Sequence, residues 1–118
     1  MARPFCTLLG IVLIGVGLWG VVTGAHAHEL LVFGVNGSHN LVHLISGVLA
    51  IAAAWAGAGA ARTFCLAFGA IYGVVAVAGF TNISSVVGLL NLNRADDLLH
   101  AAIAAACLAV GSMKEPGA

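Results

Sequence analysis

Histidine and carboxylate side chains recur in two short polar blocks of an otherwise apolar chain. The blocks are Asn36-Gly-Ser-His39-Asn40-Leu-Val-His43 and Asn93-Arg-Ala-Asp96-Asp97-Leu-Leu-His100. The i, i+4 spacing puts His39 with His43, and Asp96 with His100, on shared helix faces. Imidazole nitrogens and carboxylate oxygens are suitable ligands for zinc, iron or copper. If the two helices pack together, His39, His43, Asp96 and His100 are candidate ligands of one metal ion.

His43 and His100 also allow two other interpretations. Each lies about 10 Å along its helix from the first residue of its block, at a rise of ~1.5 Å per residue. Two histidines at equal depth on facing helices are possible axial ligands of a haem iron. Alternatively, each imidazole bonds a backbone carbonyl or hydroxyl of the next helix and holds the helices together. Ionisable groups at membrane depth are functional candidates by default, so all three interpretations stay open.

The asparagines that begin the blocks have a structural interpretation. Asn36 and Asn93 are predicted helix N-caps, whose side-chain oxygens accept from the first free amides of the helix. Asp96 stands at the third helical position, where its carboxylate reaches back as in a capping box. These roles explain the polar residues at the helix starts without any ligand.

Composition predicts how the blocks are positioned. Of the 118 residues, 62% are apolar and 7% are charged, and the mean hydropathy is +1.13. A soluble domain needs far more charged surface, whereas the length suits four spans of about 20 residues. No run alternates with period two, and only helices satisfy the backbone in lipid at this chain length. We therefore predict an all-α, four-transmembrane-helix bundle in a lipid bilayer, with helices at about 5–23, 37–58, 63–80 and 94–112.

The match between the blocks predicts an internal repeat. Each block begins the second helix of a helical hairpin, so hairpins at about 5–60 and 61–113 form one integral membrane domain. A further match places Leu18-Trp19-Gly20-Val21-Val22 beside Ile71-Tyr72-Gly73-Val74-Val75. Two tandem hairpins enter the membrane in the same direction and are related by a pseudo-two-fold axis along the membrane normal.

Basic residues predict the orientation. Arg3, Arg62 and Lys114 lie at one set of helix ends and Arg94 at the other. By the positive-inside rule both termini face the cytoplasm of a multi-pass plasma (inner) membrane protein. The stretch Ala25-His26-Ala27 resembles a signal-peptide cleavage site. The preceding apolar run, 8–22, is long for a signal peptide, so we expect the first helix to be retained.

Small residues and missing motifs narrow the function. The GxxxG pairs Gly20–Gly24 and Gly69–Gly73 are typical of close helix packing, and they favour a homo-oligomer or membership of a larger membrane complex. No nucleophile–base set, phosphate-binding glycine loop or basic aromatic patch is present, which argues against catalysis, nucleotides and nucleic acid. No charge lies near the membrane midplane, where ion-coupled transporters need one. We expect a non-catalytic role without a cofactor; the alternative is a metal- or haem-binding redox module at the outer membrane face.

These motifs resemble a known family. The strings are Gly34-Val-Asn36-x-x-His39-Asn40-Leu-Val-His43-Leu-x-x-Gly47, Ile71-Tyr72-Gly73 before Gly79-Phe80, and Asn93-x-x-Asp96-Asp97-x-Leu-His100. Together they are similar to the bacterial membrane family called domain of unknown function 4383, over most of the chain. The resemblance implies a small four-helix integral membrane protein and carries no activity with it.

Overall fold

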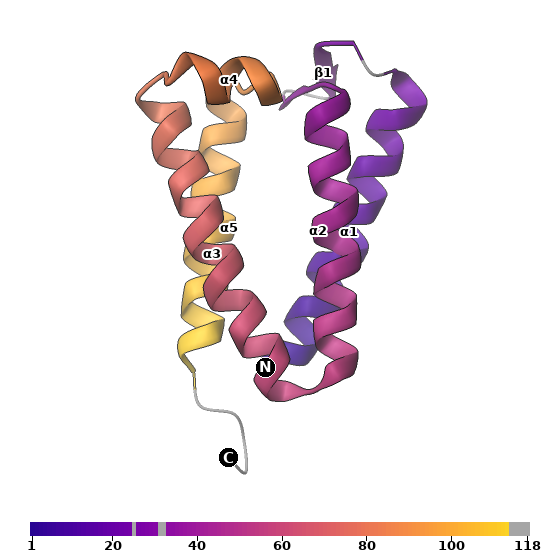
Figure 1. Cartoon of the computed structure of the whole chain (residues 1–118), viewed down its shortest axis with the longest axis vertical. Helices are drawn as coiled ribbons and strands as arrows, with labels where there is room; N and C mark the ends of the chain where they lie inside the picture. Colours follow the sequence, from indigo (N-terminus) through magenta and orange to yellow (C-terminus); the bar gives the residue numbers. More distant parts are fainter. Residues whose placement is uncertain (25, 31–32, 114–118) are drawn as a thin grey trace.

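The computed structural model describes residues 1–24, 26–30 and 33–113, with the backbone alone for Leu30. Ala25 and Lys114, which entered the predictions of cleavage and orientation, lie outside the described residues. The elements in chain order are α1 (Ala2–Thr23), β1 (His28–Leu30), β2 (Phe33–Val35), α2 (Gly37–Ala56), α3 (Ala58–Phe80), α4 (Ser84–Leu90) and α5 (Arg94–Ser112) (Figure 1).

Four of these helices, α1, α2, α3 and α5, are long and apolar enough to cross a membrane. They pack as two pairs, α1 with α2 and α3 with α5, and Figure 1 shows the pairs standing side by side. The predicted all-α class with four membrane-spanning helices is confirmed. Most large apolar side chains outside the pair interfaces are exposed and face the lipid, as expected when water is not the surrounding solvent.

The structure differs from the prediction in its connections. A single residue, Gly57, joins α2 to α3, and its φ of 136° favours glycine. The predicted loop before Thr63 is therefore part of α3. The two connections at the other end contain an antiparallel hairpin of β1 and β2 and the seven-residue helix α4. We predicted neither, because strands of three residues and a helix of two turns are too short to give a periodic signal.

Small residues bring the helices of each pair together. In the first pair, a Cβ on Gly10 would lie 2.8 Å from the carbonyl oxygen of Gly47, so only glycine fits. In the second pair, Gly69 packs against Leu108 and Gly111 against Leu66. Close backbone approach lets dispersion contacts hold helices together in lipid. Gly73 makes no such contact, since its nearest neighbour, the Cβ of Ala104, would be 3.9 Å away.

Matching contacts hold the two pairs at the end where α1 begins and α5 ends. Arg3 Nε donates to the carbonyl oxygen of Ala54 at 2.8 Å, and Arg62 Nε donates to that of Gly111 at 3.3 Å. Each arginine therefore satisfies a carbonyl near the end of its partner helix, where such groups lack helical partners. Between the pairs, the sulfur atoms of Cys6 and Cys65 lie 3.5 Å apart.

Candidate metal centre

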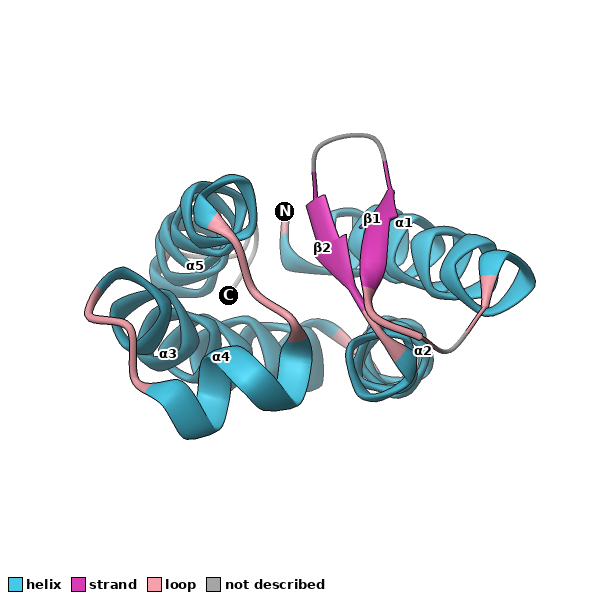
Figure 2. Ribbon diagram, turned by 90° about the horizontal axis from the view of Figure 1, so that it is seen from above, coloured by secondary structure: helices cyan, strands magenta, loops and turns pink. Residues whose placement is uncertain are grey.

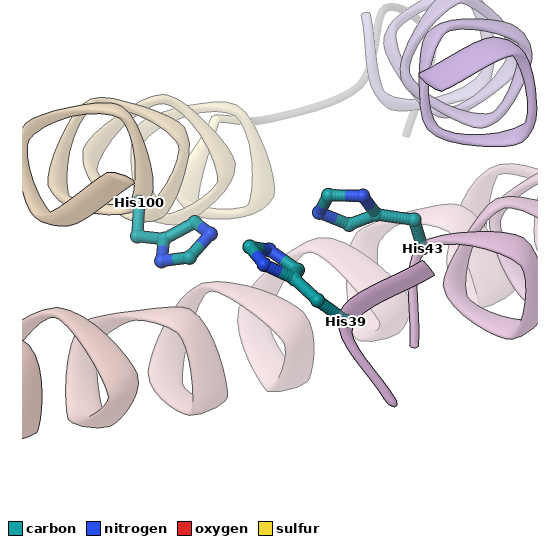
Figure 3. A group of neighbouring side chains, drawn as sticks. All are labelled: His39, His43 and His100. Atoms are coloured by element: carbon teal, nitrogen blue, oxygen red, sulfur yellow. The ribbon is translucent and has the colours of Figure 1, made fainter. Parts of the chain in front are cut away.

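Three histidines converge between the two helix pairs. His39 and His43 come from the first two turns of α2, and His100 comes from the second turn of α5. Each offers a ring nitrogen, and the three nitrogens all lie within 4.8 Å of one another. Figure 3 shows the ring of His39 between those of His43 and His100. All three side chains are buried, with exposed fractions of 2%, 8% and 4%.

Caps fix where both helices begin. Asn36 Oδ1 accepts from the backbone N–H of His39 at 2.9 Å, and Asn93 Oδ1 accepts from that of Asp96 at 3.0 Å. The Asp96 carboxylate completes a capping box by accepting from the N–H of Asn93 at 2.9 Å. Asn36 also donates to the carbonyl oxygen of Leu89, which ties α2 to the end of α4. The caps thus set the height of the histidines in both helices.

Asp96 lies apart from the group of converging ligand atoms. The oxygen of its capping box, Oδ2, accepts a second hydrogen bond, at 3.0 Å, from the backbone N–H of Gly34 in β2. Asn91 holds the same strand by donating to the carbonyl oxygen of Val35 at 2.9 Å. Three of the four predicted ligand candidates therefore come together, while the fourth anchors the β-hairpin over the helix ends.

The histidine cluster has unused hydrogen-bonding capacity. Among the described residues, both ring nitrogens of His39 and the Nδ1 atoms of His43 and His100 have no hydrogen-bond partner. Backbone groups of Gly34 and Leu90 lie near the His39 ring, but outside hydrogen-bond geometry. A buried polar atom without a partner costs about 1–3 kcal/mol. These nitrogens are therefore free to bind a ligand or an ordered water molecule.

Asn40, which follows His39, and Asp97, which follows Asp96, each pack on a glycine of the partner helix. A Cβ on Gly20 would overlap the amide of Asn40, and a Cβ on Gly79 would overlap the carboxylate of Asp97. Asp97 accepts a hydrogen bond from Arg94 at 3.3 Å, whereas the Asn40 amide has no partner among the described residues. In these contacts the counterpart of Gly20 is Gly79, whereas the Leu18-Trp19 match in the sequence pairs it with Gly73.

A pocket of about 160 Å³ adjoins the histidines on the side of α1 and α5. Its polar lining comes from His43, His100 and Asp96, and the rest is apolar. The remaining lining residues are Val12, Leu13, Val16, Trp19, Phe33, Val35, Leu99 and Ile103. The pocket thus joins a ligand cluster to an apolar chamber, an arrangement common in small-molecule sites.

Tyr72 covers the cluster on the side of α3, and the sequence analysis gave it no role at the site. Its ring makes an edge-type contact with the ring of His100, at a centroid distance of 5.1 Å. The ring of Phe68 lies on it at a centroid distance of 4.1 Å. One signal was available. The run Ala-Arg-x-Phe-Cys-x-x-x-Gly occurs at 2–10 and again at 61–69, and this alignment puts Leu13 opposite Tyr72.

The fold and the site define a class of protein: a multi-pass membrane protein of four spans with a buried histidine cluster at one end. A family model described as Domain of unknown function (DUF4383) matches residues 3–113, so the chain belongs to that family and the resemblance seen in its motifs is confirmed. No curated protein and no solved structure matches the chain.

Proposed function

We propose that this protein binds one transition-metal ion through His39, His43 and His100. The observation that carries the proposal is the convergence of three buried imidazoles whose ligand nitrogens lie within 4.8 Å of one another. Two nitrogens on one ion, each about 2.1 Å from it, are separated by at most about 4.2 Å. Small side-chain rotations therefore bring this set onto an ion.

The chemistry of the donors selects the ion. Imidazole suits zinc and copper, whereas magnesium and calcium need oxygen ligands. Three neutral imidazoles do not offset the positive charge of the ion. The buried carboxylates of Asp96 and Asp97, at the start of the helix that carries His100, supply negative charge nearby. Copper(I) and zinc(II) both fit, with three protein ligands and one coordination position left for an outside ligand.

The other two interpretations of the histidines are less well supported. A haem with His43 and His100 as axial ligands needs its porphyrin plane between them, where the His39 ring lies (Figure 3). A purely structural role needs hydrogen bonds from each ring to the neighbouring helix. Among the described residues, His43 Nδ1 and His100 Nδ1 have no such partner.

Metal analysis of the purified protein tests the proposal. We expect about one zinc or copper ion per chain after growth with both metals, measured by mass spectrometry of the elements in detergent. His39→Ala, His43→Ala and His100→Ala should each lower metal affinity by about 100-fold or more, since each removes a direct ligand. His26→Ala is the matched control because His26 is exposed. Equal metal content in all four variants, or none in the wild type, contradicts the proposal.

We also propose that the metal centre faces the outside of the plasma membrane, with both termini in the cytoplasm. Arg3 and Arg62 both lie at the helix ends opposite the histidines, which fits the positive-inside rule. Reporter fusions after residue 57 and within 81–83 test it. A cytoplasmic signal from the first and an external signal from the second are expected; the reverse pattern contradicts it.

A second candidate function, self-association, has one observation in its favour. A shallow apolar groove on α3 is lined by Gly69, Ala70, Gly73, Val74 and their neighbours, and Gly73 leaves it open. We propose that a helix of a second copy fits there, as small residues favour. Gly73→Leu should then shift the sedimentation of the detergent-solubilised protein from dimer to monomer, while Gly15→Leu should not. A wild-type monomer at all concentrations contradicts it.

A further inference from the structure

The pocket beside the histidines opens toward the lipid. Three of its lining residues are strongly exposed: Val12 by 51%, Trp19 by 46% and Leu99 by 41%. They belong to α1 and α5, which come from different helix pairs. In a bilayer, apolar side chains exposed on these helices face the acyl chains. Figure 2 shows β1 and β2 lying between α1 and α5 at this end, so the hairpin forms the roof of the pocket.

Among the described residues, the two sides of the cluster differ in how far they are covered. On the side of α3, the Tyr72 ring lies against His100 and is 4% exposed. On the side of α1, Leu13 aligns with Tyr72 and lines the pocket. Its side chain is much shorter than that of tyrosine. His43 and His100 face this pocket, while His39 does not line it. A metal held by the three histidines therefore has its remaining coordination position toward α1 and α5.

We propose that a small, neutral, lipid-soluble diatomic molecule binds at that position, entering through the pocket from the bilayer. This inference rests on the proposed metal site. The step is plain coordination: a lone pair of the diatomic molecule forms a bond to the metal, a loosely held water molecule leaves if one is present, and no electron is transferred. Protein nitrogens and the backbone keep their protons throughout.

The lining favours a neutral, apolar ligand, and a diatomic gas is the smallest member of that class. The described lining contains no Lys or Arg, and its one charged residue is the acidic Asp96, so no lining side chain offsets the cost to an anion of leaving water. A pocket of about 160 Å³ admits a diatomic molecule without rearrangement of the helices. Its apolar walls resemble the acyl chains, so a neutral molecule passes from lipid into the pocket without a desolvation penalty.

Carbon monoxide on the copper(I)-loaded protein tests the inference. We expect an infrared band for copper-bound carbon monoxide in detergent and in lipid vesicles. Leu13→Tyr should fill the pocket and lower carbon monoxide affinity by about tenfold or more without changing the copper content. Leu8→Tyr, on the lipid face of the same helix, is the matched control and should bind as the wild type does. Should Leu13→Tyr fail to fold, Val16→Phe fills the same pocket.

The outcomes separate the two proposals. Full copper loading with no carbon monoxide band, or an unchanged affinity in both filled variants, overturns the inference and leaves the metal site standing. Failure of the wild type to hold copper or zinc overturns the metal site and the inference with it. Azide added to the copper(II)-loaded protein should leave its electron paramagnetic resonance spectrum unchanged. A large azide effect shows an aqueous route for anions and overturns entry from the bilayer.

Discussion

The two helix pairs share a framework and differ at the end that carries the histidines. In both pairs an arginine donates a hydrogen bond to a carbonyl near the C-terminal end of the partner helix. In both, a glycine packs against the polar side chain of Asn40 or Asp97. Such agreement supports the proposal that the pairs are copies of one hairpin. The differences lie where the site is: His39 stands where the second pair has Asp96, and Leu13 where it has Tyr72.

These differences have a physical consequence. Two identical halves would place identical groups around the central axis, whereas the ligand set here is two histidines from one half and one from the other. Asp96 instead holds β2, which belongs to the first half, through the N–H of Gly34. The shared framework therefore supplies the helix geometry, and the differences between the two pairs supply the donors, the roof and the open side of the pocket.

Introducing a charge at Asn40, the position that matches Asp97, should have the largest effect on stability. Asn40→Asp places a carboxylate against Gly20, where no described cation corresponds to Arg94 beside Asp97. We expect a loss of at least about 3 kcal/mol in the free energy of unfolding, since a buried charge has no partner. Titration with denaturing detergent measures it. Adding Gly37→Arg should restore part of the loss; a neutral single variant would show that the position is hydrated.

Adding a methyl group at Gly20 or at Gly79 should destabilise the helix pair that contains it, by a similar amount in each case. Gly20→Ala and Gly79→Ala each push a methyl group into the side chain that packs there, and overpacking costs about 1–3 kcal/mol. Gly15→Ala is the control because no atom lies within 4 Å of its added methyl group, so it should be neutral or slightly stabilising. The same unfolding titration compares them. A large effect in one pair only would argue against a shared framework.

Opening the closed side tests the asymmetry of the pocket. Tyr72→Leu removes the ring that lies against His100 and Phe68, and we expect a loss of about 2 kcal/mol in stability from the cavity. In the double variant with Leu13→Tyr, the open side moves from α1 to α3. Infrared titration should then show carbon monoxide binding restored relative to Leu13→Tyr alone. No recovery would mean that Tyr72 is not the barrier.

The arginine bonds should give the smallest effects. Arg3→Ala and Arg62→Ala each remove one hydrogen bond to a carbonyl at the end of the bundle opposite the histidines, worth about 1 kcal/mol. The effect of Arg3→Ala should be the larger because its bond is 2.8 Å long and that of Arg62 is 3.3 Å. Thermal unfolding followed by circular dichroism measures both. Arg3→Lys and Arg62→Lys keep the charge and serve as controls for orientation in the membrane.

The membrane-spanning helices could be predicted from sequence because their signals are local. Long apolar runs, capping asparagines and i, i+4 spacing all act within one helix, and they fixed the ends of α2 and α5 near Asn36 and Asn93. The same local periodicity put His39 with His43 on one face of α2. The short strands were not predicted, because three-residue strands are stabilised by contacts with distant residues such as Asn91.

The composition of the site was decided by the tertiary structure. Sequence spacing states which side chains share a face, but the rotation of α2 against α5 depends on packing between separate helix pairs. That packing brought three histidines together and left Asp96 to bind the backbone of Gly34, which lies far away in the chain. It also placed Tyr72 against His100 and Leu13 in the lining of the pocket. Residue types limited what could bind, whereas long-range contacts determined which of them meet.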